Sequence, residues 1–441
     1  MHFFRAAGLM AATSVLVPVV GVATAPILAH GLGVAGRGTA AAALAPNVLL
    51  AGAATLGLPD ALTYFLAKTP DRTRAALRVT CLLSVVVGAA AFAVVAVSAP
   101  LLSGGVRDLD RLIVLATAFA IPLLLVNLLR GAAIGRHMWT AVAAERVANS
   151  FLRLIALALL LVLGQLTVLN AVLVMAIGPL VAGAAYWRLI VSPAPAAATA
   201  NDERAGAGDL VRYGTRMWLG SVASIVISRL GPLLVTPLSD VRQLGLLTAA
   251  VAIADVPFIV ATSVRDVLFG ADSRERDATR LALLTRASTG LALLGALALG
   301  LSLPLWIEFA FGRGFAAAMP ATWVLLASVV VNVPGWMAGS GLSAWGRPEL
   351  RSVGLVASLL ANLAVLLLLV PPFGALGAAV AALIGALTLT GFTLVASSSV
   401  VGVHYRDLIL PRREDLRAAF RAAQGVIASR RARHRQRSGP A

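Results

Sequence analysis

The sequence predicts an all-α membrane protein of about twelve transmembrane helices, and three observations lead to this fold class. Of the 441 residues, 59% are hydrophobic and 12% are charged, and the mean hydropathy is +0.91. A soluble domain is roughly 45–50% apolar and about a quarter charged, so this chain lies outside the soluble range. The apolar residues fall in repeated runs of about 20, the length of helix that crosses a bilayer. The period-2 alternation that marks an outer-membrane barrel is absent from the sequence.

The apolar runs place both ends of the chain on the same side of the membrane. With the N-terminus inside, 28 of the 36 basic residues fall in inner segments and five in outer ones. The positive-inside rule therefore predicts cytoplasmic ends and an even number of spans. We expect a multi-pass protein of the plasma (inner) membrane, and the Ala- and Arg-rich composition favours a bacterial source. The candidate spans lie at about residues 6–29, 40–66, 77–102, 111–129, 147–165, 168–190, 210–236, 243–270, 281–303, 320–340, 352–371 and 374–399.

The spans divide into two halves. Residues 191–208 are rich in Pro, Ala and Gly and are predicted to form a cytoplasmic linker. We expect six-helix bundles at 1–190 and 209–399, packed around a central cavity, and a basic tail at 400–441. Two halves in the same orientation form a parallel repeat, as in transporters that rock one half against the other. Scarce residues recur 206 positions apart, as in the pairs Pro26 and Pro232, Asp60 and Asp266, Asp71 and Asp277, and Arg74 and Arg280.

The seventh span carries the residue that points most directly to a function. Arg229 lies about two-thirds of the way through an apolar helix that Pro232 and Pro237 then interrupt. A charge at that depth costs several kcal/mol, so such residues usually face a wet cavity or a partner and mark a transport path. Ser224 and Ser228 lie beside Arg229, and we predict that all three bind substrate. The alternative interpretation is an arginine locked in a structural ion pair.

The eighth span has a polar face that completes this candidate site. Thr248, Asp255, Thr262 and Asp266 are spaced 7, 7 and 4 residues apart, which places them on one side of a helix. Because the seventh and eighth spans are antiparallel neighbours, Asp255 lies within side-chain reach of Arg229. The two residues either work together in the cavity or simply neutralise each other.

Three further polar residues have two interpretations each. Arg216 lies near the inner face of the seventh span and either binds substrate or extends toward lipid phosphates. Arg153, on the fifth span, has the same ambiguity. Asp60 follows Pro59 near the inner end of the second span, where it either lines the cavity or caps a kinked segment. We retain Arg216 and Asp60 as candidate site residues.

Composition also excludes several kinds of site. The single Cys81 lies inside an apolar run, the five His have no metal-ligand spacing, and no Walker loop is present. We therefore predict no cofactor and no metal. The net charge of +17 does not indicate nucleic acid, because the tail places its arginines at intervals of four beside an apolar stripe. This pattern predicts an amphipathic helix held by anionic lipid on the inner leaflet. Its basic residues include Arg413, Arg417 and Arg421.

Several stretches resemble the polysaccharide, or lipid-linked oligosaccharide, flippase family, whose superfamily also holds multidrug exporters and peptidoglycan-precursor flippases. The resemblance covers both halves in order. It rests on LGVAGRGTAAAALAPNVLLAGAATLGLPDALTYFLAK at 32–68, FGRGFAAAMP at 311–320, GLSAWGRPE at 341–349 and NLAVLLLLVPPFGALGAAVAALIG at 362–385.

The resemblance implies a V-shaped pair of bundles whose cavity is lined largely by spans one, two, seven and eight. It also implies a polyprenyl-diphosphate-linked oligosaccharide as substrate, moved from the inner to the outer leaflet, and a polysaccharide polymerase as a possible partner. Family members often carry an Asp within two residues of the seventh-span Arg, whereas this chain has Gly231. That departure leaves the coupling-ion role of the region open.

Two other functions compete with the flippase. A cation-coupled multidrug exporter of the same fold needs an acidic, aromatic-lined cavity, whereas the chain has four Tyr and places an Arg in the candidate site. A membrane glycan polymerase or ligase needs a substantial outer loop, and the longest predicted outer connection, at 304–320, carries only Glu308 and Arg313. No acid–base constellation is assembled, so we predict that the chain is not an enzyme.

Overall fold

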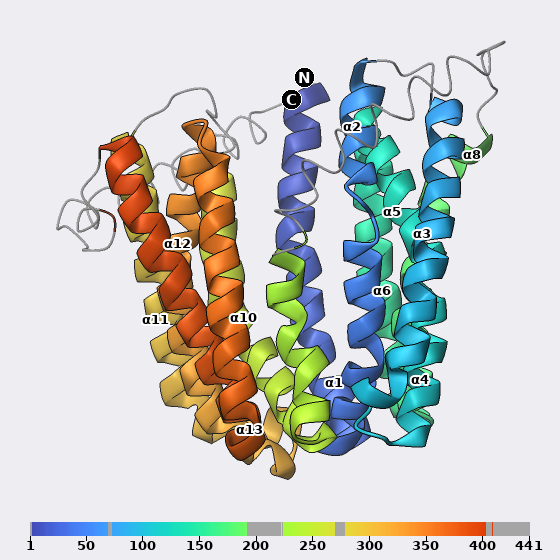
Figure 1. Ribbon diagram of the computed structural model, residues 1–441, viewed down its shortest axis with the longest axis vertical. Helices are drawn as coiled ribbons and strands as arrows, with labels where there is room; N and C mark the ends of the chain where they lie inside the picture. The colour runs from blue at the N-terminus through green and yellow to red at the C-terminus, as the bar shows by residue number, and fades with distance from the viewer. Residues whose placement is uncertain are drawn as a thin grey trace, which may run out of the picture.

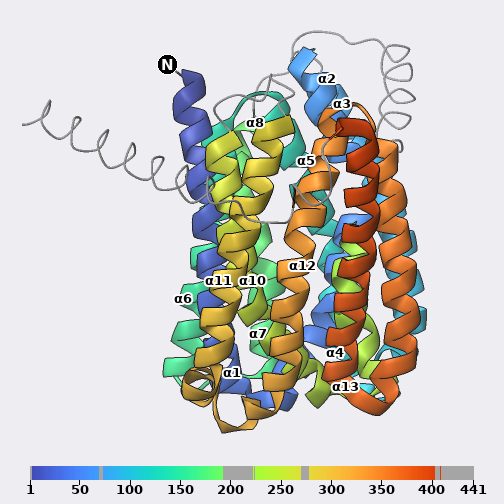
Figure 2. The same ribbon diagram turned by 90° about the vertical axis from the view of Figure 1, so that its left-hand side faces the viewer.

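The computed structural model describes residues 2–68, 73–191, 222, 224–269, 278–402 and 408. These residues form helices joined by short turns, with no strand among them. The helices run along one common axis in two perpendicular views (Figures 1 and 2). The predicted all-α class is therefore confirmed. The chain is a multi-pass membrane protein.

The N-terminal bundle contains the helices before residue 192. α1 and α2 are followed by the long α3, and α4 and α5 together cover the predicted fourth span. The bounds are α1 (His2–Ala53), α2 (Leu58–Lys68), α3 (Thr73–Leu102), α4 (Arg107–Ala118), α5 (Ala120–Gly135), α6 (Trp139–Val162), α7 (Val168–Ala182), the 3-10 turn η2 (Gly183–Tyr186) and α8 (Trp187–Val191).

The C-terminal bundle begins, in the described part of the chain, with the apolar helix Ser224–Leu238. The remaining elements pack on one another through extensive helix contacts, the largest of which joins α12 and α13. Their bounds are α10 (Val241–Phe269), α11 (Ala278–Phe311), the 3-10 turn η3 (Arg313–Ala318), α12 (Met319–Ala344) and α13 (Pro348–Val401).

Two of the helices, α1 and α13, each fold back on themselves. Their non-helical residues are Gly33, with φ of 66°, and Gly374, with φ of 53°, a conformation that glycine adopts without steric cost. In α13, the Ser358 hydroxyl donates a hydrogen bond of 2.7 Å to the carbonyl of Gly385. These residues are 27 positions apart and would be separated by about 40 Å in a straight helix. α13 therefore supplies two predicted spans, and α1 supplies the first span and the first part of the second, which α2 completes.

The twelve predicted spans all coincide with helices among the described residues. In the described part of the chain, eight helical segments are long and apolar enough to cross a membrane, and two of them are the folded α1–α2 and α13 segments. The shorter helix Ser224–Leu238 covers the described part of the seventh span, and α6 covers the fifth. The predicted limits of the two bundles stay predictions. The linker at 191–208 and the tail at 400–441 lie almost wholly outside the described residues.

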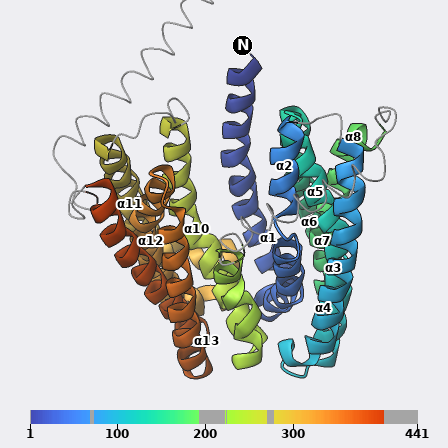
Figure 3. The same cartoon turned by 45° about the horizontal axis from the view of Figure 1, so that its top comes forward.

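The bundles meet along a line that we call the seam. On the N-terminal side it is formed by α1, at Val34, Gly38 and Gly52, and the residues opposite include Ile225 and Gly245. In Figures 1 and 3 the ribbons of the two bundles diverge toward the side where α1 begins and α13 ends. We call this the terminus side and the opposite side, where α1 and α13 fold back, the far side. The bundles thus hold together mainly on the far side.

Candidate functional site

The face of α10 that carries Asp255 points toward the N-terminal bundle. Thr248 and Asp255 are seven residues apart, so they lie on the same side of the helix. Thr248 contacts Arg37 of α1, which shows that this side faces the seam. Asp255 lies about 10 Å farther toward the terminus side, and its side chain is exposed. The two bundles therefore do not close over Asp255.

The helix Ser224–Leu238 brings Arg229 into the same region. In Figures 1 and 3 this yellow-green helix lies between α1 and the C-terminal bundle. It packs on both sides, through Ile225 against Gly52 of α1 and through Gly231 against Leu247 of α10. Ser224 and Ser228 are exposed on it, whereas Arg229 is half-buried. Three of the predicted substrate-binding residues thus lie together at the seam.

Arg229 and Asp255 interact without forming a close pair. Their opposite charges attract each other, as the position of the two helices predicts. Neither side chain makes a hydrogen bond or an ion pair with any residue that the structure describes. The Ser228 hydroxyl donates to the carbonyl of Ile225, within its own helix. The guanidinium donors of Arg229 therefore remain free of described protein partners.

On the far side the seam is closed by a cluster that we call the clasp, formed by Arg37, Ala25, Thr248, Phe311 and Phe315. Arg37 is 6% exposed and uses all three guanidinium nitrogens. Nε donates to Oγ1 of Thr248 at 3.1 Å, Nη2 to the Thr248 carbonyl at 3.0 Å, and Nη1 to the Ala25 carbonyl at 2.6 Å. Its Cζ lies 5.4 and 5.9 Å from the ring centroids of Phe311 and Phe315.

Two glycines let the backbones come together beside the clasp. A Cβ placed on Gly245 of α10 would overlap the carbonyl oxygen of Val34, and one on Gly38 of α1 would overlap the carbonyl oxygen of Val241. Small residues allow such close helix–helix contact in membrane proteins. The far side is therefore closed by direct backbone packing as well as by Arg37.

The other predicted site residues are not brought into this group by the described contacts. Asp60 is exposed in the first turn of α2, where a carboxylate complements the helix dipole. Arg216 lies outside the described residues. Thr262 and Asp266 belong to α10, but their side chains are outside the described part. These assignments remain predictions.

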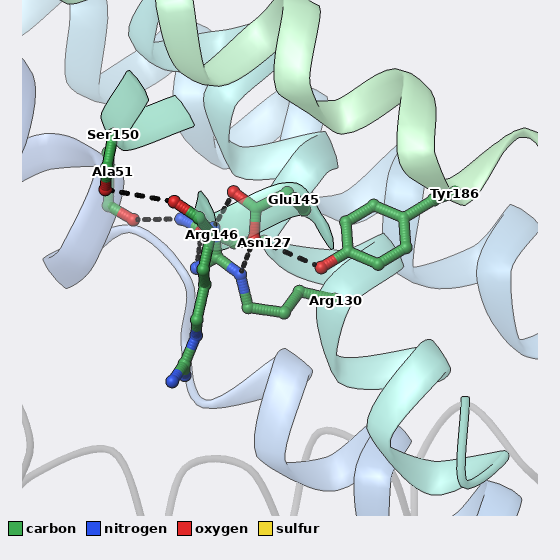
Figure 4. Close-up of polar contacts among 7 residues, drawn as sticks. All are labelled: Ala51, Asn127, Arg130, Glu145, Arg146, Ser150 and Tyr186. Atoms are coloured by element: carbon green, nitrogen blue, oxygen red, sulfur yellow. Dashed lines mark hydrogen bonds and ion pairs between the residues drawn. The ribbon is translucent and has the colours of Figure 1, made fainter. Parts of the chain in front are cut away.

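A polar network in the N-terminal bundle, shown in Figure 4, was not anticipated from the sequence. Glu145 of α6 is 1% exposed and accepts two hydrogen bonds from Arg130, at 2.9 and 3.0 Å. Tyr186 donates to the same carboxylate at 3.2 Å. Arg130 also donates to Asn127, which in turn donates to the carbonyl of Ala51. The network joins α1, α5, α6 and η2. Its two charged residues, Arg130 and Glu145, are paired with each other and hydrogen-bonded within the bundle.

Comparison with known families identifies the chain. A family model described as polysaccharide biosynthesis protein matches residues 5–271, which is more than half of the sequence. The chain belongs to this family. The match covers the N-terminal bundle and continues through the helix Ser224–Leu238 and α10, so the seam residues fall inside it. Among curated proteins, none matches the chain.

Solved structures show that this member of the polysaccharide biosynthesis protein family has the fold of MOP superfamily transporters. Lipid II flippase MurJ, in an inward closed conformation, is similar with a TM-score of 0.71, 12% identity, and 90% of this chain and 88% of that chain covered. An inward-facing multidrug resistance MATE family transporter has a TM-score of 0.65, 15% identity, and 89% and 98% coverage.

A third similar structure is a MOP superfamily transporter from Pyrococcus furiosus Vc1. Its TM-score is 0.51 at 14% identity, with 90% of this chain and 96% of that chain covered, and it is described as having a binding pocket of reverse polarity that suggests a different function. At these identities the likeness shows the fold, so the function of this family member must be argued from its own residues.

Proposed function

We propose that the protein is a flippase that carries a polyprenyl-diphosphate-linked oligosaccharide from the inner to the outer leaflet by alternating access. The observation that supports this most strongly is Arg229, an arginine within the seventh predicted span that has no hydrogen bond or ion pair among the described residues. Its helix ends at Leu238 on the far side, nine residues or about 13 Å away. A guanidinium with unused donors binds phosphate oxygens through two parallel hydrogen bonds.

The geometry supports an order of events. With the clasp closed on the far side and the bundles diverging on the terminus side, a head group enters from the terminus side and reaches Arg229. In the absence of substrate Asp255 attracts Arg229, and the diphosphate then replaces Asp255 as the anionic partner of Arg229. Opening of the clasp then exposes the head group to the far side, while the lipid tail stays in the bilayer. The charge pattern of the sequence assigns the terminus side to the cytoplasm.

Family membership supports the same substrate class. The protein belongs to a family described as polysaccharide biosynthesis proteins, and a structure with a similar fold is named as a lipid II flippase. We therefore place the protein in the plasma membrane. The polymerase that would consume the flipped precursor, and anionic lipid beneath the basic tail, are its expected partners.

The second candidate is a multidrug exporter, which the similar MATE family structure favours. The residues at the seam argue against a multidrug exporter, because a cationic drug would be repelled by the positive charge of Arg229. Among the described residues, the carboxylate near that charge is Asp255, and it already attracts Arg229. An anionic head group suits this site better than a cation does.

Transport by the purified protein in liposomes tests the proposal. A fluorescently labelled polyprenyl-diphosphate disaccharide is reconstituted, and its appearance in the opposite leaflet is followed by quenching. We expect Arg229→Gln to lower the rate by roughly 10- to 100-fold, the equivalent of losing a hydrogen bond to a charged group. Arg242→Gln removes an exposed charge at the start of α10 and serves as the control. Equal rates in Arg229→Gln and the wild type would refute the assignment.

A further inference from the structure

α6 carries a polar stripe that the seam does not use. Glu145, Asn149 and Arg153 follow one another at intervals of four residues and therefore lie on one face of the helix. At one end of the stripe, Glu145 is saturated by Arg130 and Tyr186 (Figure 4). At the other end, two turns deeper in the membrane, Arg153 has no carboxylate beside it among the described residues.

The guanidinium of Arg153 is packed into the bundle but is not satisfied there. Its Nε is buried and has no hydrogen-bond partner in the described part of the chain. Its terminal nitrogens also make no hydrogen bond with the described residues, yet they are not among the fully buried unpaired atoms. Nη2 lies against α1, 3.5 Å from the place that a Cβ on Gly21 would occupy. A ligand can therefore reach the end of the side chain.

Asn149 presents a second unused polar group one turn away. It is half-buried and makes no hydrogen bond with any residue that the structure describes. Its Oδ1 lies 3.4 Å from the place that a Cβ on Gly178 of α7 would occupy. Arg153 thus faces Gly21 of α1, and Asn149 faces Gly178 of α7. Neither glycine has a side chain that would fill the space beside these polar groups.

An arginine at this depth needs compensation. Arg153 lies nine residues, or about 13 Å, before the far-side end of α6 at Val162, which is too far for its side chain to extend to the interface. An unpaired charge within a membrane helix is expensive and usually marks a binding site or a relay. Glu145 of the same helix, by contrast, is paired with Arg130 and Tyr186 within the bundle.

We propose that Arg153 and Asn149 form a second binding site, inside the N-terminal bundle, for an oxyanion of the phosphate class. The guanidinium donates two parallel hydrogen bonds to such an anion, and the Asn149 amide donates a third. The anion is either a free phosphate or diphosphate or the diphosphate of a lipid. The site is separate from Arg229 and Asp255, which belong to the other half, and it does not depend on the proposed transport cycle.

Binding to the full-length protein in phosphatidylcholine nanodiscs tests this site. Calorimetric titrations use inorganic pyrophosphate as one probe and polyprenyl diphosphate incorporated in the nanodisc as the other. We expect Arg153→Gln to weaken binding of at least one probe tenfold or more, and Asn149→Ala to weaken it severalfold. Arg146→Gln removes a positive charge from the same helix and is the matched control, with binding unchanged. Circular dichroism and size exclusion establish that each variant is folded.

The two probes separate the sources of the anion. Loss of pyrophosphate binding in Arg153→Gln supports a site for a free anion, whereas loss confined to polyprenyl diphosphate supports a site for the lipid head group. Unchanged affinity of folded Arg153→Gln for both probes overturns the proposal. Should Arg153→Gln not fold, Asn149→Ala decides, and unchanged affinities there overturn the proposal equally.

The variant Arg229→Gln allows the test of the second binding site to be separated from the test of the proposed flippase function. Arg229→Gln is expected to retain pyrophosphate binding that depends on Arg153, whatever its effect on transport. Normal transport by Arg229→Gln would refute the proposed role of Arg229 in a flippase. It would not affect the proposal that Arg153 and Asn149 bind an anion. If transport fails in Arg229→Gln and Arg153→Gln has no effect on binding, the flippase proposal is supported and the second binding site is refuted.

Discussion

Two arginines at the seam, Arg37 and Arg229, have opposite surroundings. Arg37 is 6% exposed and satisfies its guanidinium with three hydrogen bonds and two aromatic rings. Arg229 is half-buried and sits beside exposed serines, and among the described residues it has only the attraction of Asp255. A saturated arginine stabilises one arrangement of the bundles, whereas an unsaturated one retains donors for a ligand. The comparison separates Arg37, which joins the two bundles on the far side, from Arg229, which we propose binds the substrate.

The largest expected effect is on stability, from the loss of Arg37. Arg37→Ala removes hydrogen bonds that join α1 to α10 and the contact with Phe311 and Phe315. We expect a destabilisation of about 2–4 kcal/mol, because hydrogen bonds to charged groups contribute about 1.5–3 kcal/mol each and do not add. Arg229→Gln should leave the thermal unfolding temperature in detergent nearly unchanged. A fall as large in Arg229→Gln as in Arg37→Ala would contradict the distinction.

The next effect concerns the close approach of the backbones at the far side. Gly245→Ala forces the carbonyl of Val34 away and should cost about 1–3 kcal/mol in the closed arrangement. Distances between spin labels on the two bundles should then lengthen on the far side. Gly290→Ala is the matched control, because a Cβ there meets nothing within 4 Å. Unchanged distances in Gly245→Ala would show that the glycine contact does not hold the far side closed.

The smallest effect is expected at Asp255. Asp255→Asn removes a charge that attracts Arg229. Because the Asp255 side chain is exposed, this attraction is screened and contributes up to about 1 kcal/mol. Binding of polyprenyl diphosphate should therefore tighten by no more than about fivefold. Weaker binding in Asp255→Asn would mean that the carboxylate positions Arg229 for the head group, not that it competes with the head group.

Much of this fold could be predicted from hydropathy alone. The tenth span was predicted at 320–340 and is part of α12 (Met319–Ala344), because a run of apolar residues of that length has few alternatives in a bilayer. The face of α10 with Thr248 and Asp255 could also be predicted, since it depends only on helical period. The break at Leu56 and Gly57, both with positive φ, divides the predicted second span and depends on packing that hydropathy does not encode.

The clasp could not be predicted in the same way. Arg37 lies between the first two predicted spans, and its partner Thr248 is 211 positions away in the sequence. Only the reversal of α1 at Gly33 and the meeting of the two halves bring them together. Glu145 did carry a signal, since an acidic residue close to the start of a predicted span needs a cation. Which of the neighbouring arginines supplies that cation depends on the packing of α5 against α6.

The central claim is that Arg229 faces water between the bundles, and thiol accessibility tests it most directly. The free Cys81 is replaced by Ser, and a single cysteine is placed at Ser228, beside Arg229. A cysteine at Leu305, which is 85% exposed near the far-side end of α11, is the control. We predict that Ser228→Cys reacts with a membrane-impermeant maleimide added from the terminus side and Leu305→Cys does not. Failure of Ser228→Cys to react from either side would contradict the account.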